Sequence, residues 1–188
     1  EDIENILIIN GAKTDYNTSL IKEGYDSILT PYIEQGRIEI IEEYWADNWL
    51  KEKAFDYTEA ILKDGYNIDA ILSGNDSLAE GAFEALSEYR LSGIVGLVGQ
   101  DADLTACQRI VEGNQLMTVY KPINELVTVA IEMGIKLAKK EKIITQTTMN
   151  DGTYEIKCVF LDPIAVDKQN IDSTIIKDGF HLKADIYR

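Results

Sequence analysis

Six polar or aromatic residues stand out in this sequence because each comes shortly after a short apolar segment. They are Asp15, Asn17, Trp49, Asn75, Asp101 and Lys121. Hydroxyl groups both donate and accept hydrogen bonds, so carboxylates, carboxamides and an ammonium group can all be matched to them. An indole face can also cover the CH side of a sugar ring and exclude water. The set therefore favours a neutral, polyhydroxylated ligand.

The stretch Leu97–Asp103 shows the pattern most clearly. An apolar run that is broken only by Gly96 stops at Gly99, and Asp101 follows after one more residue. The next eight residues carry apolar side chains at helical spacing. This predicts a buried strand, a tight turn and a helix, with Asp101 just past the carboxyl end of the strand and Asp103 as a helix cap. In open α/β sheets, ligands bind at that end of the strands.

Each candidate also has an ordinary structural interpretation. Asp15, Asn17 and Asn75 can be turn residues or helix caps, and taken singly that role is the more common one. Trp49 can pack into the core, and Lys121 can simply be solvated. Their coincidence at one edge of a sheet is what favours a binding site over these separate roles.

The elements that must position these residues alternate between strand and helix five times. Such alternation predicts an α/β fold, a doubly wound parallel sheet flanked by helices. The first helix is expected to be capped by Asn17 or Thr18 and the second by Asp47 or Asn48. Residues 145–152 are expected to form turns, and the chain after residue 162 is expected to be irregular. Predicted strands cover residues 6–9, 38–44, 68–72, 94–98, 116–120 and 154–161.

Composition excludes several classes of function. The 188 residues are 45% apolar and 27% charged, as in ordinary globular proteins. A net charge of −15 argues against a nucleic-acid partner, because phosphate binding needs clustered lysine and arginine. No apolar run approaches the roughly 20 residues that span a bilayer. The acidic start Glu1–Asn5 leads directly into a strand, so no signal peptide is expected within this sequence.

Motifs for catalysis, metals and cofactors are not recognised in the sequence. Cys107 and Cys158 are far apart and lack neighbouring metal ligands, so free structural thiols are expected. The single histidine, His181, is expected to have a packing or surface role. No phosphate-binding or dinucleotide-binding glycine motif occurs. The sequence thus predicts no cofactor and no metal.

Six collinear stretches together resemble the periplasmic sugar-binding proteins with the ribose-binding fold, and among them the xylose-type branch. The two most specific stretches are Gln100–Leu104 and Met117–Pro122. The others are Thr14–Asn17, Trp45–Leu50, Ser73–Asp76 and Ile175–His181.

The resemblance implies that the six candidate residues line the pocket of one lobe of a two-lobe protein. It implies a carboxyl-terminal lobe at residues 1–121, a crossover helix and strand at 122–162, and a tail at 163–188 that returns to the lobe and hinge. The amino-terminal lobe is then not part of this sequence. The apolar face of the helix at 123–140 would need a cover, either that missing lobe or a second chain.

The resemblance also implies a function without catalysis. Members of the family bind a sugar between two lobes outside the cytoplasmic membrane, in the periplasm or on a lipid anchor. For this chain the implied ligand is D-xylose or a near pentose. The implied partner is an ABC-type permease, a chemoreceptor or a sensor histidine kinase.

Two alternatives remain open at this point. The chain could be the core of a sugar-responsive transcription regulator that lacks its DNA-binding module. It could also be a sugar-active enzyme that uses Asp15 and Asp101 as a carboxylate pair, since retaining glycosidases place two such groups about 5 Å apart.

Overall fold

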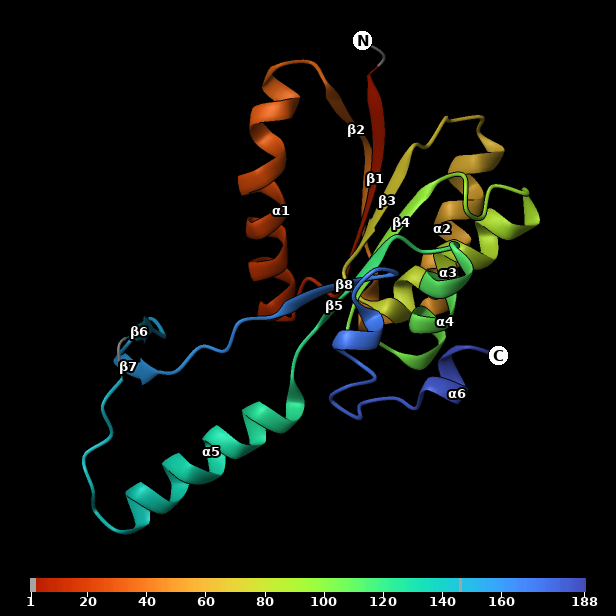
Figure 1. The fold of residues 1–188 in the computed structure, drawn as a ribbon. Coiled ribbons are helices and arrows are strands. Elements are labelled where there is room, and N and C mark those ends of the chain that lie inside the picture. Colours follow the sequence, from red (N-terminus) through yellow and green to blue (C-terminus); the bar gives the residue numbers. More distant parts are fainter. Residues whose placement is uncertain (1–2, 146) are drawn as a thin grey trace. The chain divides into compact units, whose positions relative to one another are not determined.

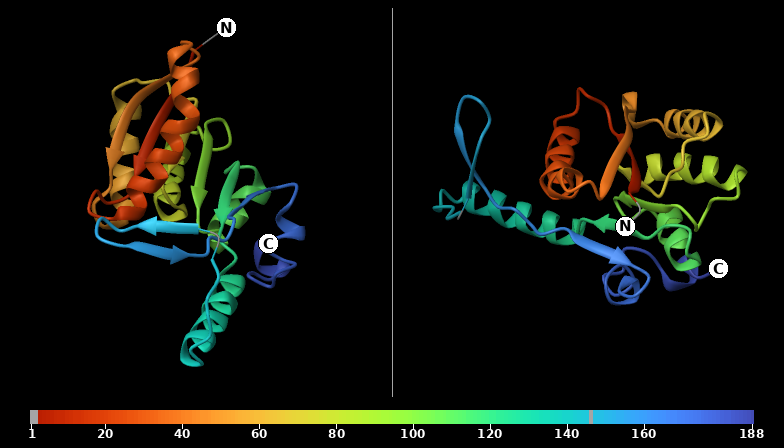
Figure 2. Two further views of the ribbon diagram at one scale, coloured as in Figure 1. Left: turned by 90° about the vertical axis from the view of Figure 1, so that its left-hand side faces the viewer. Right: turned by 90° about the horizontal axis from the view of Figure 1, so that it is seen from above.

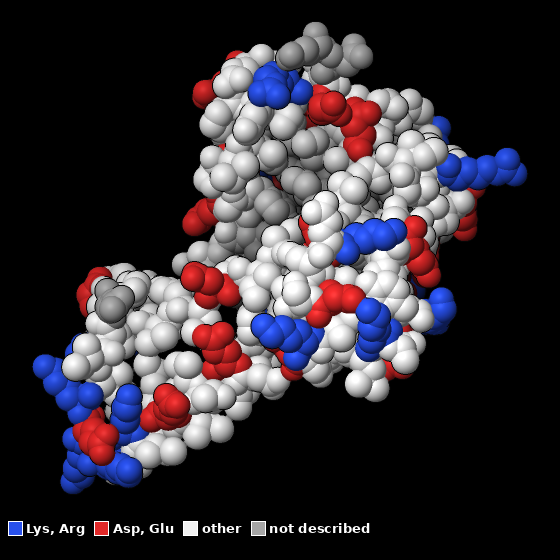
Figure 3. Space-filling view, viewed as in Figure 1, with Lys and Arg blue, Asp and Glu red and all other residues white. Residues whose placement is uncertain are grey.

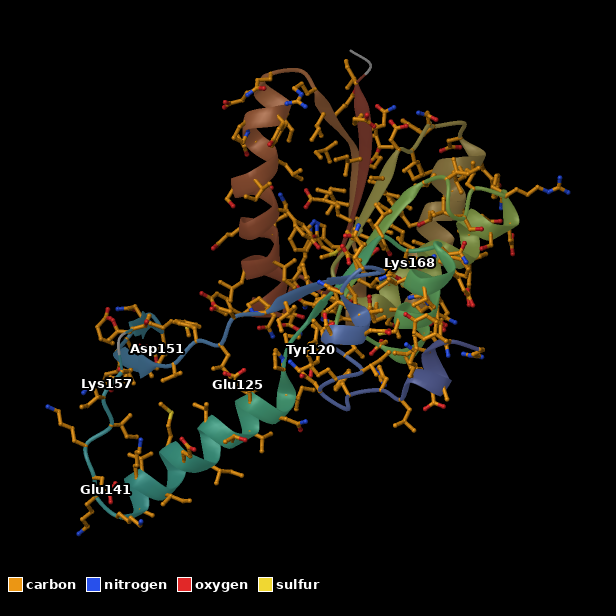
Figure 4. All side chains as sticks on the ribbon, viewed as in Figure 1. Tyr120, Glu125, Glu141, Asp151, Lys157 and Lys168 are labelled. Atoms are coloured by element: carbon orange, nitrogen blue, oxygen red, sulfur yellow. The ribbon has the colours of Figure 1, made fainter. Side chains whose placement is uncertain are left out.

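A computed structural model describes residues 3–145 and 147–188, and Figure 1 shows its fold. The chain divides into two compact units. The first runs to Tyr120 and resumes at Ala165–Arg188, and the second is Lys121–Ile164. Tyr120, labelled in Figure 4, is the last residue before the first boundary. The assignment of these segments to lobes stays a prediction from the sequence.

The first unit is built on a mostly parallel sheet, which confirms the predicted fold class. Its strand order is β2-β1-β3-β4-β5-β8, and the pairs from β2 to β5 are all parallel. The interior strand β1, which lies between β2 and β3, carries the apolar run Ile6–Ile9, and these residues are buried because neighbours cover both faces and both edges. The strands are β1 (Glu4–Asn10), β2 (Ile38–Trp45), β3 (Ala70–Ser73), β4 (Gly96–Gln100), β5 (Met117–Tyr120) and β8 (Ile164–Asp167).

Helices cover both faces of this sheet. Figure 2 shows α1 on one face and α2 and α3 together on the other. The core lies between the sheet and the helices α2 and α3, where Leu7, Ile71 and Leu97 meet Ala54 and Ala82. The helices of this unit are α1 (Tyr16–Glu34), α2 (Lys51–Lys63), α3 (Asp76–Glu88), α4 (Leu104–Glu112) and α6 (Lys183–Ile186).

The second unit consists of helix α5 (Ile123–Ala138) and a hairpin of β6 (Thr147–Asn150) and β7 (Glu155–Cys158). Asp151, labelled in Figure 4, closes the hairpin turn by accepting the backbone N–H groups of Tyr154 and Thr153 at 2.7 and 2.8 Å. These bonds hold the pKa of its carboxyl below the ordinary value. Local polar contacts therefore stabilise the hairpin turn.

Helix α5 buries none of its residues. Leu126, Ile131 and Leu137 are 54%, 57% and 64% exposed. Lysines gather at its carboxyl end, where the helix dipole favours positive charge, and Figure 3 shows them as a blue cluster. Within the second unit, the hairpin and the segments beside it leave this apolar face exposed.

Several local expectations from the sequence are wrong. Asp15, rather than Asn17 or Thr18, caps α1, because its carboxylate reaches the Asn17 N–H. Neither Asp47 nor Asn48 caps α2, since both belong to a preceding 3₁₀ turn, η1 (Asp47–Trp49).

The chain after residue 144 also departs from its predicted structure. Residues 147–150 form the hairpin strand β6. Their polarity is compatible with a strand because both faces of β6 are exposed. The tail contains β8 and α6 rather than irregular chain. Only one residue of β8, Val166, is buried, and the apolar run Ile164–Val166 is only three residues long, which is too short to predict a strand.

The two cysteines are free, as predicted. Cys107 lies in the core, where burial raises the pKa of its thiol to about 12, and Cys158 is half-buried on β7. Within the described residues, no helix is both long enough and apolar enough to cross a membrane.

Candidate functional site

Asp15 and Asn75 follow the two strands between which the order of strands reverses, and Trp49 contacts Asp15. From β1 the chain moves to β2 on one side, whereas β3, β4 and β5 follow one another on the other side. The carboxyl ends of β1 and β3 therefore flank a topological switch point, which is the usual ligand site of such sheets. Gly11 follows β1 and Gly74 follows β3, and the Gly74 N–H donates to the Ile9 carbonyl at 2.8 Å.

The indole of Trp49 packs on these two glycines. A Cβ at Gly11 would lie 2.1 Å from Cζ2 of the ring, and a Cβ at Gly74 would lie 3.0 Å from Cζ3. The first distance leaves no room for a side chain at Gly11, so glycine is required there for this contact, and the second is tighter than an ordinary contact. The indole is half-buried, and part of its surface stays accessible at the switch point.

An unusual backbone conformation brings the indole there. Asn48 and Trp49 have φ angles of 56° and 57°, in the left-handed region that residues with a Cβ seldom adopt. The Ala46 N–H donates to the Asn10 carbonyl at 2.9 Å, and the Trp49 N–H donates to the Ala46 carbonyl at 3.1 Å. These bonds hold η1 against the end of β1 and support the strained turn.

Asp15 combines a structural and a possible ligand-binding role. Its Oδ1 accepts the Asn17 N–H at 2.9 Å, and its Oδ2 accepts the Trp49 Nε1–H at 3.1 Å. The carboxylate therefore caps α1 and fixes the indole at the same time. Both roles depend on the turn that precedes it, in which the Asp15 N–H donates to the Ala12 carbonyl at 3.0 Å.

The two asparagines differ in their surroundings. Asn75 is the amino-terminal cap of α3, and its Oδ1 accepts the Leu78 N–H at 2.9 Å. That bond directs the carboxamide and leaves its NH₂ group to donate elsewhere. Asn17 lies exposed on the first turn of α1, next to Asp15. Asn75 is thus positioned by the fold, whereas Asn17 is placed only by its helix.

The loop after β4 carries Asp101, which is half-buried. Asp101 has a φ of 108° and Ala102 a φ of 57°. Two consecutive residues in this region cost about 1–3 kcal/mol each, so the surrounding structure must hold them. Asp103 follows at the cap position of α4 without a side-chain cap bond, so its predicted capping role is only positional.

A buried polar cluster lies beneath this loop and is centred on Asp76, which is 1% exposed. Its Oδ2 accepts the Thr118 hydroxyl at 2.8 Å and the Asp103 N–H at 3.0 Å, while its Oδ1 accepts the Gln115 amide at 3.0 Å. A Cβ at Gly99 would lie 2.2 Å from Oδ1, so this glycine allows the carboxylate to approach β4. All three donors match an ionised carboxylate.

Burial of Asp76 predicts a pH dependence of stability. Burial raises the pKa of its carboxyl from the ordinary 3.8 to about 6, although Thr118, Gln115 and the Asp103 N–H oppose the shift. The folded state therefore binds the proton more tightly than the unfolded state. Asp76 therefore adds about 3 kcal/mol to the free energy of unfolding below pH about 4, and this contribution is lost as the pH rises to about 6.

Urea unfolding of the wild type and of Asp76→Asn between pH 4 and 7 measures this contribution. We expect the difference between the two free energies of unfolding to change across pH 4–6 and to be flat above it. A difference that is constant from pH 4 to 7 would place the pKa of Asp76 at its ordinary value.

The chain matches a known protein family over most of its length. Residues 2–142 match the family described as periplasmic binding protein domain. The chain belongs to the periplasmic binding protein family. It is 46% identical to the D-xylose-binding periplasmic protein of Haemophilus influenzae over 184 residues, which are 97% of this chain and 55% of that protein. It is 40% identical to the protein of the same description from Escherichia coli, with 97% and 56% covered.

A solved structure shares the fold of this family member. The carbohydrate transporter solute-binding protein from Chloroflexus aurantiacus, in complex with D-glucose, superposes with a TM-score of 0.87 at 24% identity. The match covers 98% of this chain and 62% of that one. The chain thus spans about half the length of the curated relatives that it matches.

The candidates differ in their positions along the sheet. Asp15 and Trp49 are in direct contact, and Asn75 follows the glycine on which the indole packs. Asp101 lies at the end of β4, one strand further along the sheet. Lys121 is exposed directly after β5 and begins the second unit. The set of six as one sugar site stays a prediction.

The enzyme alternative gains no support from the relatives, which are described as D-xylose-binding periplasmic proteins. At Asp15, both carboxylate oxygens accept a hydrogen bond, one from the backbone of Asn17 and one from the indole of Trp49. These bonds fix the carboxylate as a hydrogen-bond acceptor, and each oxygen keeps a lone pair for a further donor such as a hydroxyl group. This geometry suits a binding cage.

Sequence reasoning missed the residues that support the site. Asp76, Gly11, Gly74 and Thr118 are not among the six candidates that the sequence indicated. The sequence contains a signal for the glycines, because Gly11 comes shortly after the predicted strand 6–9 and Gly74 comes shortly after the predicted strand 68–72, next to Asn75. The alternation of inward and outward residues on β5 could also have placed Thr118 on the buried face.

His181 has the predicted packing role: its Nε2 lies 2.8 Å from the Ala102 carbonyl oxygen, and its ring contacts Phe180.

Proposed function

We propose that this chain is the sugar-binding carboxyl-terminal lobe of an extracytoplasmic receptor for D-xylose or a near pentose. Its similarity to two D-xylose-binding periplasmic proteins extends over 97% of the chain and supports this ligand class. The receptor is a binding protein rather than an enzyme. A second lobe supplies the rest of the pocket, and the two lobes close on the sugar.

The observation that carries this proposal is the arrangement of Trp49, Asp15 and the two glycines. A half-buried indole, held flat on Gly11 and Gly74 and fixed through Nε1 by Asp15, forms a rigid apolar surface at a sheet edge rich in polar groups. Sugars present an apolar CH face and a rim of hydroxyl groups, so this surface complements them. Asn75 and Asp101 lie where they can bind that rim.

The membrane partner of the closed receptor is an ABC-type permease, a chemoreceptor or a sensor histidine kinase. Uptake is the simplest of these roles for a protein of this family. Closure makes a surface from both lobes that an open receptor lacks, and this surface is what a partner would recognise.

A calorimetric titration of the full-length gene product that contains residues 1–188 tests the proposal. We expect saturable binding of D-xylose, with much weaker binding of ribose, arabinose and glucose. Tryptophan fluorescence, recorded in parallel, should change on binding because Trp49 lies in the site. Binding of none of these sugars in either measurement would remove the proposed function and leave the fold.

The apolar face of α5 adds a prediction about assembly. Leu126, Ile131 and Leu137 expose apolar surface whose burial is worth about 25 cal/mol per Å². We propose that the other lobe covers this face in the full-length protein, as the sequence predicts. Residues 1–188 made alone are expected to self-associate, and Ile131→Gln with Leu137→Gln is expected to reduce that.

Sedimentation velocity over a range of concentrations measures the association. The full-length protein serves as the control, because its second lobe should leave the face covered and the protein monomeric. An uncovered apolar face also binds hydrophobic dyes. A 188-residue chain that stays monomeric and binds no hydrophobic dye would therefore contradict the prediction.

A further inference from the structure

The loop Asp101–Asp103 is anchored through its three backbone N–H groups. The Asp101 N–H donates to the Val119 carbonyl at 2.9 Å, in the manner of a strand. The Ala102 N–H donates to the Thr118 hydroxyl at 3.1 Å, and the Asp103 N–H donates to Asp76 Oδ2 at 3.0 Å. Two of these three anchors are therefore side chains from β5 and α3.

The two side-chain anchors are coupled to each other. The Thr118 hydroxyl accepts the Ala102 N–H and donates its own proton to Asp76 Oδ2 at 2.8 Å. Asp76 thus orients the hydroxyl, and without that acceptor the Thr118 oxygen would be free to rotate its lone pair away from Ala102. Both side chains are completely or almost completely buried, at 0% and 1% exposed.

A second layer fixes Asp76 itself. The Gln115 side-chain NH₂ group donates to Asp76 Oδ1 at 3.0 Å, and Arg109 Nε donates to the Gln115 side-chain oxygen, Oε1, at 3.0 Å. Arg109 is only 5% exposed and forms an ion pair with Glu80 at 3.4 Å. The anchor of the loop is thus a chain of polar contacts across α3, α4 and β5.

The loop needs these anchors, together with the contact of His181 Nε2 to the Ala102 carbonyl oxygen at 2.8 Å, because its conformation is strained. Asp101 and Ala102 both have positive φ angles, at 108° and 57°, and neither is glycine. A relaxed backbone would turn the Asp101 side chain in a different direction. The polar cluster therefore determines where that carboxylate points.

We propose that Asp76 and Thr118 are positioning residues, which hold the Asp101–Asp103 backbone so that the Asp101 carboxylate is directed toward the bound sugar. This inference rests on the proposed function, because it assumes that Asp101 binds the ligand. Neither residue needs to touch the sugar. Their effect is on the geometry, and hence the strength, of a hydrogen bond that Asp101 makes.

Three threonine variants of the full-length protein separate positioning from packing. Thr118→Val keeps the shape but removes the hydroxyl, whereas Thr118→Ser keeps the hydroxyl and removes a methyl group. Thr58→Val is the matched control, because Thr58 on α2 is equally buried and its hydroxyl has no hydrogen-bond partner. Affinity for D-xylose is measured by calorimetry, and the melting temperature is measured without sugar.

We expect Thr118→Val to weaken D-xylose binding by about tenfold, which corresponds to part of one hydrogen bond to a charged group. Thr118→Ser and Thr58→Val should bind as the wild type does. If the role of Thr118 were packing alone, the serine variant would be affected at least as much as the valine variant. Equal affinity of Thr118→Val and the wild type would overturn the proposal.

Amide hydrogen exchange gives a readout that needs no sugar. In Thr118→Val, we expect faster exchange at Ala102 and Asp103, while the amides of β1 exchange as in the wild type. Unchanged exchange at both residues would overturn the anchoring role whatever the titration gives. If the wild type binds no sugar, the proposed function fails, and with it the link to Asp101, while the exchange result still decides whether the loop is anchored in this way.

Discussion

Asp101→Ala is expected to weaken the binding of D-xylose by the full-length protein by about 10- to 150-fold. The substitution removes a charged acceptor, and a hydrogen bond to a charged group contributes about 1.5–3 kcal/mol. Asp101 also sits on a loop that is anchored in one conformation, so no neighbouring group can easily take its place. Isothermal titration calorimetry measures the change in affinity.

Asp103→Ala provides the matched control for this prediction. Asp103 is an acid two residues further along the same loop, it is exposed, and its side chain makes no cap bond to α4. Its backbone N–H, which Asp76 binds, is retained in alanine. We expect near-wild-type affinity. If both variants lose affinity equally, the effect comes from the acidity of the loop and Asp101 has no specific contact with the sugar.

Gly81→Ala is expected to lower the free energy of unfolding by about 2 kcal/mol. A Cβ at Gly81 would lie 2.2 Å from the Lys51 carbonyl oxygen and 3.0 Å from the Phe55 nitrogen, so α2 and α3 would have to separate. Overpacking of this kind costs about 1–3 kcal/mol or more, because backbone atoms cannot move aside as a flexible side chain can. Urea unfolding followed by circular dichroism measures the loss.

Gly24→Ala tests whether the effect comes from packing. Gly24 is exposed on α1, and a Cβ there would have no atom within 4 Å. Because alanine favours a helix over glycine, this variant is expected to gain about 0.5–1 kcal/mol. If Gly81→Ala were also stabilising, α2 and α3 would be further apart than the structure places them.

Most of the fold could be predicted because its signals are local. The run Ile6–Ile9 is long enough to mark a strand that is buried on both faces, and the alternation with helices then determines the sheet class. The prediction failed where burial is slight. Strand β8 buries only Val166 and has an apolar run of just three residues, and β6 buries nothing and is mostly polar, so neither carries a clear strand pattern.

The site could be predicted in part, for a related reason. Asp15, Asn75 and Asp101 lie at strand ends that the sequence identifies, so their placement at one edge follows from the topology. The left-handed turn at Trp49 and the partnership of Asp76 with Thr118 do not follow in that way. Each depends on contacts between segments far apart in the sequence, 42 residues in the second case, and one sequence contains no direct signal of them.

The interior position of β1, between β2 and β3, determines which amides of this structure are protected most strongly. Its amides are bonded to β2 on one edge and β3 on the other, and Leu7 and Ile9 are completely buried, so their protons can exchange with solvent only when the whole unit unfolds. Helix α5, which buries nothing, exchanges through local fraying. Amides of the same chain therefore exchange by global unfolding in β1 and by local fraying in α5. A partner that binds α5 is expected to slow amide exchange in that helix first.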